Sequence, residues 1–280
     1  MKKVLITGHK GYIGQHLVKL IKQTRPDIQI HGLDVNDSCP NYGEIRSSYS
    51  LLRVKKEQYH TIIHLAALVR VGESMENPTK YFEANVCGTA NLLNVMDWYK
   101  TNFIFASTGA AENPISPYAL SKRMAEELVK EKVRDYDNTS TSSYTIFRFY
   151  NVIGTDGFPP TNPDGLMMNL MKAKETGKFT IFGNDYPTKD GTCVREYVHV
   201  NDICRAIIKA IDNPSNRIEN LAYGDPKTTK EIVTTFAEVN KVNLSLEYGP
   251  RREGDLAESY LKDPSPYMER NYTYGEMLKI

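Results

Sequence analysis

The sequence predicts an α/β protein with a doubly wound parallel sheet, followed by a smaller lobe of mixed α/β structure. Short apolar segments that are continuous rather than alternating recur along the first half of the chain, which is typical of strands covered on both faces. Helical segments lie between them, and this alternation favours right-handed crossovers and a parallel sheet. From about residue 155 the pattern loosens into the Pro- and Gly-rich stretch GTDGFPPTNPDG. We therefore expect one domain over 1–154 and the smaller lobe over 155–280, with a soft boundary that the chain can cross again.

The elements follow in order from the residue patterns. KVLIT (3–7) is a β-branched run that ends at a glycine, and GYIGQHLVKLIKQ (11–23) places Ile13, Leu17, Leu20 and Ile21 on one helical face. Further apolar runs predict strands at 28–34, 61–67, 102–108 and 144–154, and the segments 79–99 and 117–136 predict helices.

Composition narrows the class of protein. The chain has 280 residues, 40% of them hydrophobic, which is enough for a full core. Its formal net charge of +1 gives no electrostatic reason to expect nucleic acid or an acidic membrane as a partner. The four cysteines show no C-x-x-C spacing, no metal site is expected, and no apolar stretch reaches the length of a membrane span. We expect a cytoplasmic protein.

A glycine turn joins the first strand to the first helix. Gly8, Gly11 and Gly14 form a G-x-x-G-x-x-G pattern, which permits a tight turn and lets main-chain N–H groups approach a pyrophosphate. Asp34 lies 20 residues past Gly14, at the end of the second strand, where a carboxylate can bond ribose hydroxyls. The same carboxylate repels a 2′-phosphate. The pattern predicts a Rossmann-type domain that binds NAD rather than NADP.

Two pairs of the form Tyr-x-x-x-Lys occur in the chain. Tyr223 is followed by Asp225 and Pro226, and proline disfavours a helix that would bring Lys227 above the ring. The other pair, Tyr118 and Lys122, stands at the start of a helical segment, where residues four apart share a face. The sequence therefore favours the second pair as the functional one, although a solvated surface pair has the same spacing.

A tyrosine that acts as a base near neutrality needs a strongly lowered pKa. The ordinary value is about 10, so lowering it by roughly 3 requires about 4 kcal/mol of preferential stabilisation of the phenolate. An exposed ion pair contributes about 1 kcal/mol or less. A semi-buried ammonium at Lys122 together with a cationic nicotinamide ring is expected to supply the rest. Thr108 ends a strand from which it can bond the same phenol or the reacting hydroxyl, and Ser107 lies beside it.

These residues, in this order, resemble the extended short-chain dehydrogenase/reductase family. Within it the chain is similar to the UDP-glucose (UDP-galactose) 4-epimerases, and the similarity covers residues 2 to about 263. The stretches that carry it are TGHKGYIG, VGESMENPTKYFEANVCGT, IFGNDYPTKDGTCVREYVHVND and PRREGDL. The resemblance implies an isomerase with tightly bound NAD that epimerises C4 of a UDP-hexose through a transient 4-keto sugar.

The resemblance also implies roles for individual residues. The catalytic residues are Thr108, Tyr118 and Lys122. The cofactor contacts are Gly8, Gly11, Tyr12, Ile13, Gly14, Asp34, Ala66, Asn85, Ser107, Tyr118, Lys122 and Tyr150. The substrate contacts are Thr108, Asn151, Asn169, Arg195, Arg252, Asp255 and Ser259. Two arginines suit a doubly charged pyrophosphate, and the aspartate and asparagines suit hydroxyl groups.

Several positions depart from the family pattern. The segment 109–117 and the region 35–60 are short. Members restricted to plain hexoses carry a bulky tyrosine four residues after the aspartate, where this chain has Ser259, so we expect a roomier sugar pocket that admits UDP-GlcNAc and UDP-GalNAc.

Alternative functions stay open. A uronate epimerase, decarboxylase or dehydratase of the same family is one, although dehydratases place an Asp–Glu pair where Gly109 and Ala110 follow Thr108. A non-catalytic NAD-binding module is the other. The family also implies a homodimer, in which the helices 79–99 and 117–136 pair across a two-fold axis. Ordinary packing of these two helices on the sheet fits the same sequence pattern.

Overall fold

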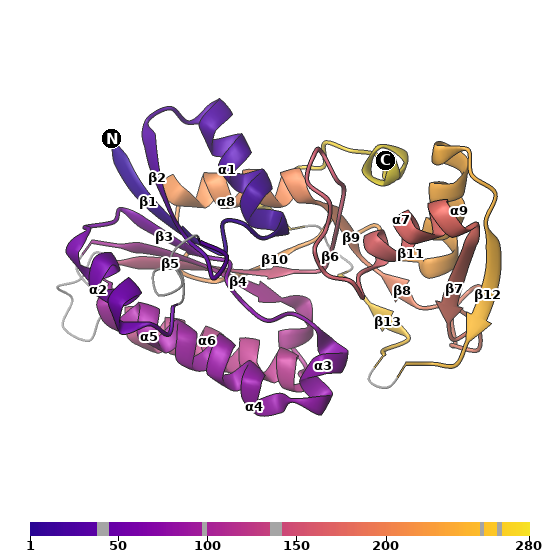
Figure 1. The fold of residues 1–280 in the computed structure, drawn as a ribbon, viewed down its shortest axis with the longest axis horizontal. Coiled ribbons are helices and arrows are strands. Elements are labelled where there is room, and N and C mark those ends of the chain that lie inside the picture. The colour runs from indigo at the N-terminus through magenta and orange to yellow at the C-terminus, as the bar shows by residue number, and fades with distance from the viewer. Residues whose placement is uncertain (38–44, 97–99, 135–141, 253–254, 262–264) are drawn as a thin grey trace. The chain divides into compact units, whose positions relative to one another are not determined.

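The computed structural model describes residues 1–37, 45–96, 100–134, 142–252, 255–261 and 265–280 (Figure 1). It divides into two compact units. The first comprises Met1–Arg148 with Cys204–Glu219, and the second comprises Phe149–Ile203 with Asn220–Ile280. The sequence predicts a soft boundary near residue 154 that the chain can cross again. The units separate after Arg148, and the chain returns to the first unit for one later segment.

The first unit is built on a sheet of six strands among the described residues, in the order β10-β5-β4-β3-β1-β2. Their bounds are β1 (Lys2–Thr7), β2 (Ile28–Leu33), β3 (Thr61–His64), β4 (Asn102–Thr108), β5 (Ser143–Phe149) and β10 (Ile218–Leu221). β1 pairs in parallel with both β2 and β3, and β3 pairs in parallel with β4. The chain thus leaves β1 first to one side and then to the other, which places a topological switch point between β1 and β3.

Helices cover both faces of this sheet. Their bounds are α1 (Tyr12–Thr24), α2 (Ser48–Lys56), α3 (Val71–Glu76), α4 (Pro78–Tyr81), α5 (Gly88–Val95), α6 (Pro117–Val133) and α8 (Val200–Asp212). Figure 1 shows α1 and α8 over one face and α5 and α6 over the other. The core between sheet and helices is aliphatic and aromatic, with Leu5, Ile62, Leu92, Phe103, Phe105 and Val129 almost fully buried.

Three predicted elements are wrong in detail. The strand expected over 61–67 is β3, which ends at His64. The helix expected over 79–99 is instead α4, a π-helical turn η1 (Phe82–Cys87) and α5, and 97–99 lie outside the described residues. The strand expected over 144–154 breaks at Tyr150 into two strands, β5 and β6 (Asn151–Ile153). β6 leaves the six-stranded sheet and pairs with β9 (Tyr197–His199). Both breaks depend on tertiary contacts that periodicity does not encode.

The second unit contains short strands and three helices among its described residues. The strands besides β6 are β7 (Lys178–Phe182), β8 (Val194–Arg195), β9 (Tyr197–His199), β11 (Lys227–Thr228), β12 (Ser245–Gly249) and β13 (Glu258–Ser259), and the helices are α7 (Leu166–Thr176), α9 (Thr229–Asn240) and α10 (Tyr274–Leu278). β8 lies between β11 and β13, β12 pairs with β7, and β6 pairs with β9. Leu170, Tyr197, Ile232, Phe236 and Met277 lie at the centre of this unit's core.

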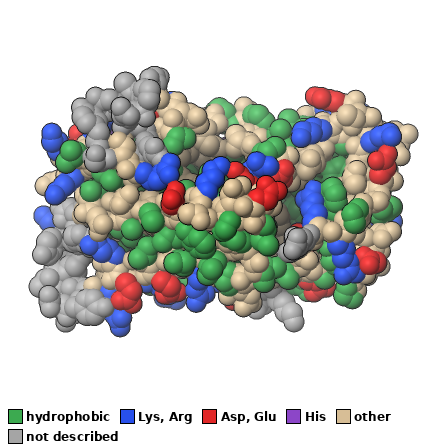
Figure 2. All heavy atoms as spheres, turned by 60° about the horizontal axis from the view of Figure 1, so that its bottom comes forward, with side chains coloured by type: hydrophobic (Ala, Val, Ile, Leu, Met, Phe, Trp, Pro, Cys, Tyr) green, Lys and Arg blue, Asp and Glu red, His purple; other side chains and the backbone are tan. Residues whose placement is uncertain are grey.

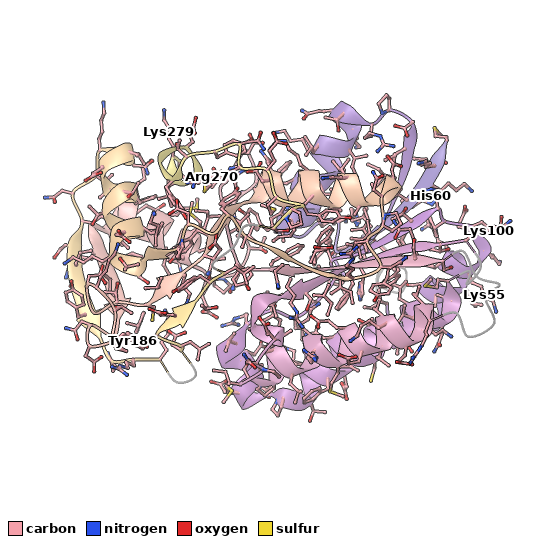
Figure 3. All side chains as sticks on the ribbon, turned by 180° about the vertical axis from the view of Figure 1, so that it is seen from behind. Lys55, His60, Lys100, Tyr186, Arg270 and Lys279 are labelled. Atoms are coloured by element: carbon pink, nitrogen blue, oxygen red, sulfur yellow. The ribbon has the colours of Figure 1, made fainter. Side chains whose placement is uncertain are left out.

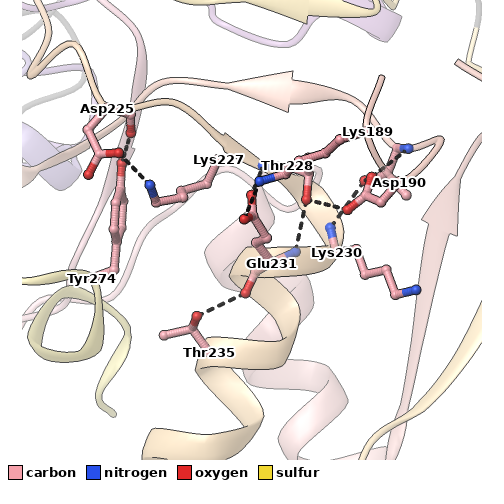
Figure 4. A network of polar contacts seen from close by, with 10 residues as sticks. Lys189, Asp190, Asp225, Lys227, Thr228, Lys230, Glu231, Thr235 and Tyr274 are labelled. Atoms are coloured by element: carbon pink, nitrogen blue, oxygen red, sulfur yellow. Dashed lines mark hydrogen bonds and ion pairs between the residues drawn. The ribbon is translucent and has the colours of Figure 1, made fainter. Parts of the chain in front are cut away.

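A polar network fixes the start of α9 (Figure 4). Thr228 Oγ1 accepts the main-chain N–H of Glu231 at 3.1 Å, and Glu231 Oε2 accepts that of Thr228 at 2.8 Å. This reciprocal capping box satisfies two N–H groups that the helix leaves unbonded. The hydroxyl of Thr228 also donates to Asp190 at 2.5 Å. In the same view Lys227 pairs with Asp225, so it has a partner other than Tyr223.

Among the residues that the structure describes, no helix combines the length and the apolar character that a bilayer crossing demands.

Candidate active site

The predicted glycine turn forms a closely packed cradle at the end of β1. Gly8 has φ +72°, and a Cβ there would lie 2.8 Å from the main-chain nitrogen of Ala66. A Cβ at Gly14 would lie 2.2 Å from the carbonyl oxygen of Gly8. Gly11 is the N-cap of α1 and brings no side chain to cap it, so the N–H groups of the first turn stay available to an anion. Only glycine fits this geometry, which suits a pyrophosphate.

Asp34 lies where a ribose-binding carboxylate is needed. It follows β2 at the same end of the sheet, is 6% exposed, and accepts main-chain N–H groups from Lys10 and Asn36, both at 3.0 Å. These bonds fix the carboxylate against the glycine turn, and each oxygen keeps a second lone pair for a hydroxyl group. The structure therefore brings Asp34 together with the three glycines. The other predicted contacts here are half-buried: the ring of Tyr12 lies edge-on to His16, and the carbonyl of Ile13 accepts the thiol of Cys204 at 3.9 Å.

A buried histidine, His64, forms hydrogen bonds next to the glycine turn. His64 ends β3, and its two ring nitrogens bond Thr7 Oγ1 at 2.7 Å and Thr89 Oγ1 at 3.0 Å. Thr7 Oγ1 in turn accepts the N–H of Ala66 at 3.3 Å. Burial lowers the pKa of His64 to about 3, so the ring is neutral. This chain of bonds joins the carboxyl ends of β1 and β3 at the switch point.

Asn85 positions a loop. Its side chain accepts the N–H of Leu68 at 2.9 Å, donates to the carbonyl of Leu68 at 3.0 Å and donates to Ser121 Oγ at 2.9 Å. Asn85 lies in the π-helical turn, a local irregularity that often marks functional sites. The amide thus holds the segment after β3, which contains Ala66, against α6. Sequence periodicity did not reveal this turn.

Tyr118 and Lys122 share one face of α6, and Thr108 lies at the phenol of Tyr118. α6 begins after Ser116, whose Oγ accepts the N–H of Ala119 at 3.2 Å, and Pro117 is its first residue. The cap and the proline direct Tyr118 and Lys122 along one face of the helix. Thr108 is the last residue of β4, and its hydroxyl bonds the phenol.

The protein groups by themselves do not make this phenol acidic. Burial raises the pKa of Tyr118 to about 12, more than the hydrogen bond from Thr108 lowers it. Burial also lowers the pKa of Lys122 to about 7, against the attraction of Glu126. Lys122 Nζ lies 4.2 Å from the centre of the Phe105 ring. Only a further positive charge next to the phenol would bring its pKa toward neutrality.

Ser107, predicted as a cofactor contact, has a buried partner that sequence reasoning missed. Its hydroxyl donates to Glu126 Oε1 at 2.5 Å, and Glu126 forms a two-bond ion pair with Arg148. All three residues are 5% exposed or less. The only signal in the sequence is that Glu126 lies four residues past Lys122.

In the second unit, Arg195, Asp255 and Ser259 lie together. β13 pairs in parallel with β8, which sets Ser259 opposite Arg195. The guanidinium of Arg195 lies 3.6 Å from Asp255 Oδ1 and donates to the carbonyl of Val194 at 2.9 Å. A cation and hydroxyl-binding groups are therefore present at one edge, as the predicted substrate contacts require.

The remaining predicted contacts of this unit are spread out. The side chain of Asn151 donates to the carbonyl of Glu196 at 3.0 Å, and that of Asn169 to the carbonyl of Asp164 at 3.3 Å. Tyr150 is half-buried between β5 and β6. The guanidinium carbon of Arg252 lies 3.9 Å from the centre of the Phe182 ring.

Arg252 and its neighbour Arg251 differ in their partners. Arg251 donates to Asp185 at 2.7 Å, and its guanidinium carbon lies 4.3 Å from the ring centre of Tyr186, which is labelled in Figure 3. The carboxylate already neutralises Arg251. Arg252 stacks on an uncharged ring, so its charge is better suited to a ligand.

Comparison with known proteins supports one family. Residues 4–223 match the model of the NAD dependent epimerase/dehydratase family. The UDP-glucose 4-epimerase of Lactobacillus helveticus is 32% identical in an alignment 291 residues long, gaps included. The alignment covers 90% of this chain and 86% of that protein. The UDP-glucose 4-epimerase of Brucella ovis, solved in complex with NAD, has a TM-score of 0.82 and 26% identity, covering 99% of this chain and 96% of that one. The UDP-Glc/GlcNAc 4-epimerase of Campylobacter jejuni has a TM-score of 0.75 and 27% identity, covering 100% and 97%.

The predicted doubly wound fold agrees with these structures and is confirmed, as is the predicted NAD cofactor. The glycine cradle and Asp34 fit the adenosine diphosphate half of that cofactor. The roles of individual site residues stay predictions. The family match spans far more than half of the sequence, and the chain belongs to the NAD dependent epimerase/dehydratase family.

Proposed function

We propose that this protein is an isomerase, an NAD-dependent UDP-hexose 4-epimerase that interconverts UDP-glucose and UDP-galactose through a transient 4-keto sugar. The observation that carries the proposal is that Thr108 lies at the phenol of Tyr118, with Lys122 on the same face of α6, in the unit that contains the glycine cradle. Relatives about 30% identical over most of the chain are named for the same reaction. The first unit would hold the cofactor and the second the nucleotide-sugar.

The residues divide the chemistry among them. Bound NAD supplies the acceptor and donor of the hydride at the sugar C4. Tyr118 removes the proton of the 4-hydroxyl and later returns it, and Thr108 bonds the phenol. The ammonium of Lys122 stabilises the phenolate. Arg195, together with Arg252, binds the pyrophosphate, so that tight contacts far from C4 leave the sugar free to turn over.

The direct test is an assay of the purified protein with UDP-galactose, in which UDP-glucose formation is followed with a coupled dehydrogenase. We expect steady turnover without added reductant, because epimerisation has no net redox change. A dehydratase would release a 4-keto-6-deoxy sugar and a decarboxylase would release CO₂ from a UDP-uronate. Tight NAD binding without any of these products would identify a non-catalytic module.

Ser259 is expected to widen substrate choice. It lies beside Arg195 and near Asp255 on the edge that we assign to the nucleotide-sugar. A small side chain there leaves room for an acetamido group, so we expect comparable turnover of UDP-glucose and UDP-GlcNAc. Ser259→Tyr should lower kcat/KM for UDP-GlcNAc by about tenfold relative to UDP-glucose, a steric discrimination of the usual size for a pocket.

Ser259→Ala is the matched control for this prediction, because it removes the hydroxyl without adding bulk and should leave the ratio of the two substrates unchanged. Equal effects of Ser259→Tyr on both sugars would place this residue outside the sugar pocket.

An exposed apolar surface supports the predicted homodimer. Leu120 and Met124 on α6 lie four residues apart and are 42% and 43% exposed, and Val71 and Met75 on the neighbouring α3 are equally exposed. Figure 2 shows hydrophobic side chains gathered over this face of the first unit. A two-fold interface uses one patch on both copies. The patch includes α3 besides α6, and the helix pairing expected from the sequence stays a prediction.

We expect Leu120→Glu combined with Met124→Glu to convert a dimer into a monomer in light scattering at micromolar concentration, since four charges would face each other across the axis. Leu52→Glu, at another position that is 57% exposed, should leave the mass unchanged. A wild-type monomer at all concentrations would contradict the dimer. The cytoplasmic location stays a prediction.

A further inference from the structure

A buried carboxylate lies one helical turn beyond Lys122. Tyr118, Lys122 and Glu126 follow one another at intervals of four residues along α6, so they share one face of the helix. Glu126 is completely buried, and Lys122 is 3% exposed. Burying a charged carboxylate is costly unless partners compensate it.

Two strands supply those partners. Glu126 Oε1 accepts from Ser107 Oγ at 2.5 Å and from Arg148 Nε at 2.9 Å, and Oε2 accepts from Arg148 Nη2 at 2.8 Å. The forked guanidinium pair fixes the plane of the carboxylate and compensates its burial. Ser107 precedes Thr108 on β4, and Arg148 belongs to β5. Glu126 thus ties the helix of Tyr118 to the strand end of Thr108.

The charged surroundings of Lys122 are sparse. Among the described residues that bear on it, His64 on β3 is neutral with a pKa of about 3, and the phenol of Tyr118 has a pKa of about 12. The face of Phe105 on β4 is uncharged, and Arg148 on β5 is paired with Glu126. Burial lowers the pKa of Lys122 to about 7, and Glu126 is the group whose charge raises it.

We propose that Glu126 is a positioning residue for the reaction: its carboxylate favours the ammonium form of Lys122 and, through Ser107, ties the strand end of Thr108 to the helix of Tyr118. The proposal rests on the proposed function, because the ammonium matters only if Tyr118 works as a base. Arg148 acts one step further away, by holding the Glu126 carboxylate through two hydrogen bonds.

The first test measures Lys122 directly in the protein as purified. Lysine labelled with ¹³C at Cε is titrated by NMR, and the Lys122 signal is assigned as the one that Lys122→Met removes. In Glu126→Gln, which preserves shape and removes charge, we expect the pKa of Lys122 to fall by about 1. Ser107→Ala removes one hydrogen bond to the carboxylate but keeps its charge, and we expect it to leave that pKa unchanged within a few tenths.

The second test uses the pH profile of epimerisation. A lower Lys122 pKa moves the alkaline limb of kcat to lower pH, so we expect Glu126→Gln to lose about tenfold at about pH 8 and much less at about pH 6. A purely structural role would lower activity equally at all pH values. Wild type without activity on UDP-galactose would defeat the proposed function, while the NMR titration would still decide the effect of Glu126 on Lys122.

Glu126→Gln leaves Arg148 without its full partner, and it can fail to fold for that reason. The double variant Glu126→Leu/Arg148→Met replaces the pair by apolar side chains of similar volume and should fold. This double variant should lower the pKa of Lys122 by less than Glu126→Gln does. An unshifted Lys122 titration in the folded variants, or a loss of activity independent of pH, would overturn the proposal.

Discussion

Tyr118→Phe is expected to lower kcat by at least about 100-fold while the fold and NAD binding stay intact, because it removes the proton acceptor and nothing else. The phenol bonds Thr108, and its ring lies edge-on to Tyr81 with centroids 6.4 Å apart, a contact that phenylalanine keeps. The measurement is turnover of UDP-galactose, with bound NAD quantified by absorbance after denaturation.

The second Tyr-x-x-x-Lys pair provides a matched control. Tyr223 donates to Asp202 at 2.6 Å and accepts the N–H of His199 at 3.1 Å, so its hydroxyl has a structural role in the second unit. Tyr223→Phe should lower the melting temperature but keep turnover per folded molecule within a few-fold. Near-normal kcat in Tyr118→Phe, or an equal loss in both variants, would contradict the assignment of the base.

Gly14→Ala is expected to abolish NAD retention and to destabilise the first unit by roughly 3 kcal/mol or more, a large value for one added methyl group. The new Cβ would lie 2.2 Å from the Gly8 oxygen and 2.7 Å from the His9 Cα. Main chain cannot move aside as a side-chain tip can, so the cradle itself must shift. Bound NAD and the denaturant midpoint of unfolding are the quantities to measure.

Gly72→Ala is the matched control, because a Cβ at Gly72 meets nothing within 4 Å. Gly72 lies in α3, where alanine is the better helix former, so this variant should be neutral or more stable by up to about 1 kcal/mol. If Gly14→Ala retained the cofactor as well as Gly72→Ala does, the glycine turn would not be the pyrophosphate site.

Local residue types made part of the fold predictable. The β-branched run before Gly8, the helical pattern after it and the acid at the end of the next strand each depend on neighbours in the chain. The strand predicted over 102–108 matches β4 residue for residue. The predicted start of a helix at Pro117 also agrees with α6, because a cap and a proline act locally.

Other features depend on groups that are distant in sequence. Asn85 lies in the π-helical turn and accepts a hydrogen bond from Leu68 in the loop after β3. Helical periodicity carries no information about a bond between residues this far apart in the sequence. Glu126 stands in the charged stretch AEELVKEK and looks like a solvent-facing residue until β5 brings Arg148 to it. The strand break at Tyr150 separates two sheets, yet the apolar run continues through it.

The opposite pKa shifts of Tyr118 and Lys122 have a consequence for folding of the chain. Burial raises the pKa of Tyr118 and lowers the pKa of Lys122, so it favours the uncharged form of each group. Folding therefore does not require these two groups to be buried as a preformed zwitterion, whose solvation energy would be lost. Chain collapse and the creation of catalytic charge are in this way separate thermodynamic events.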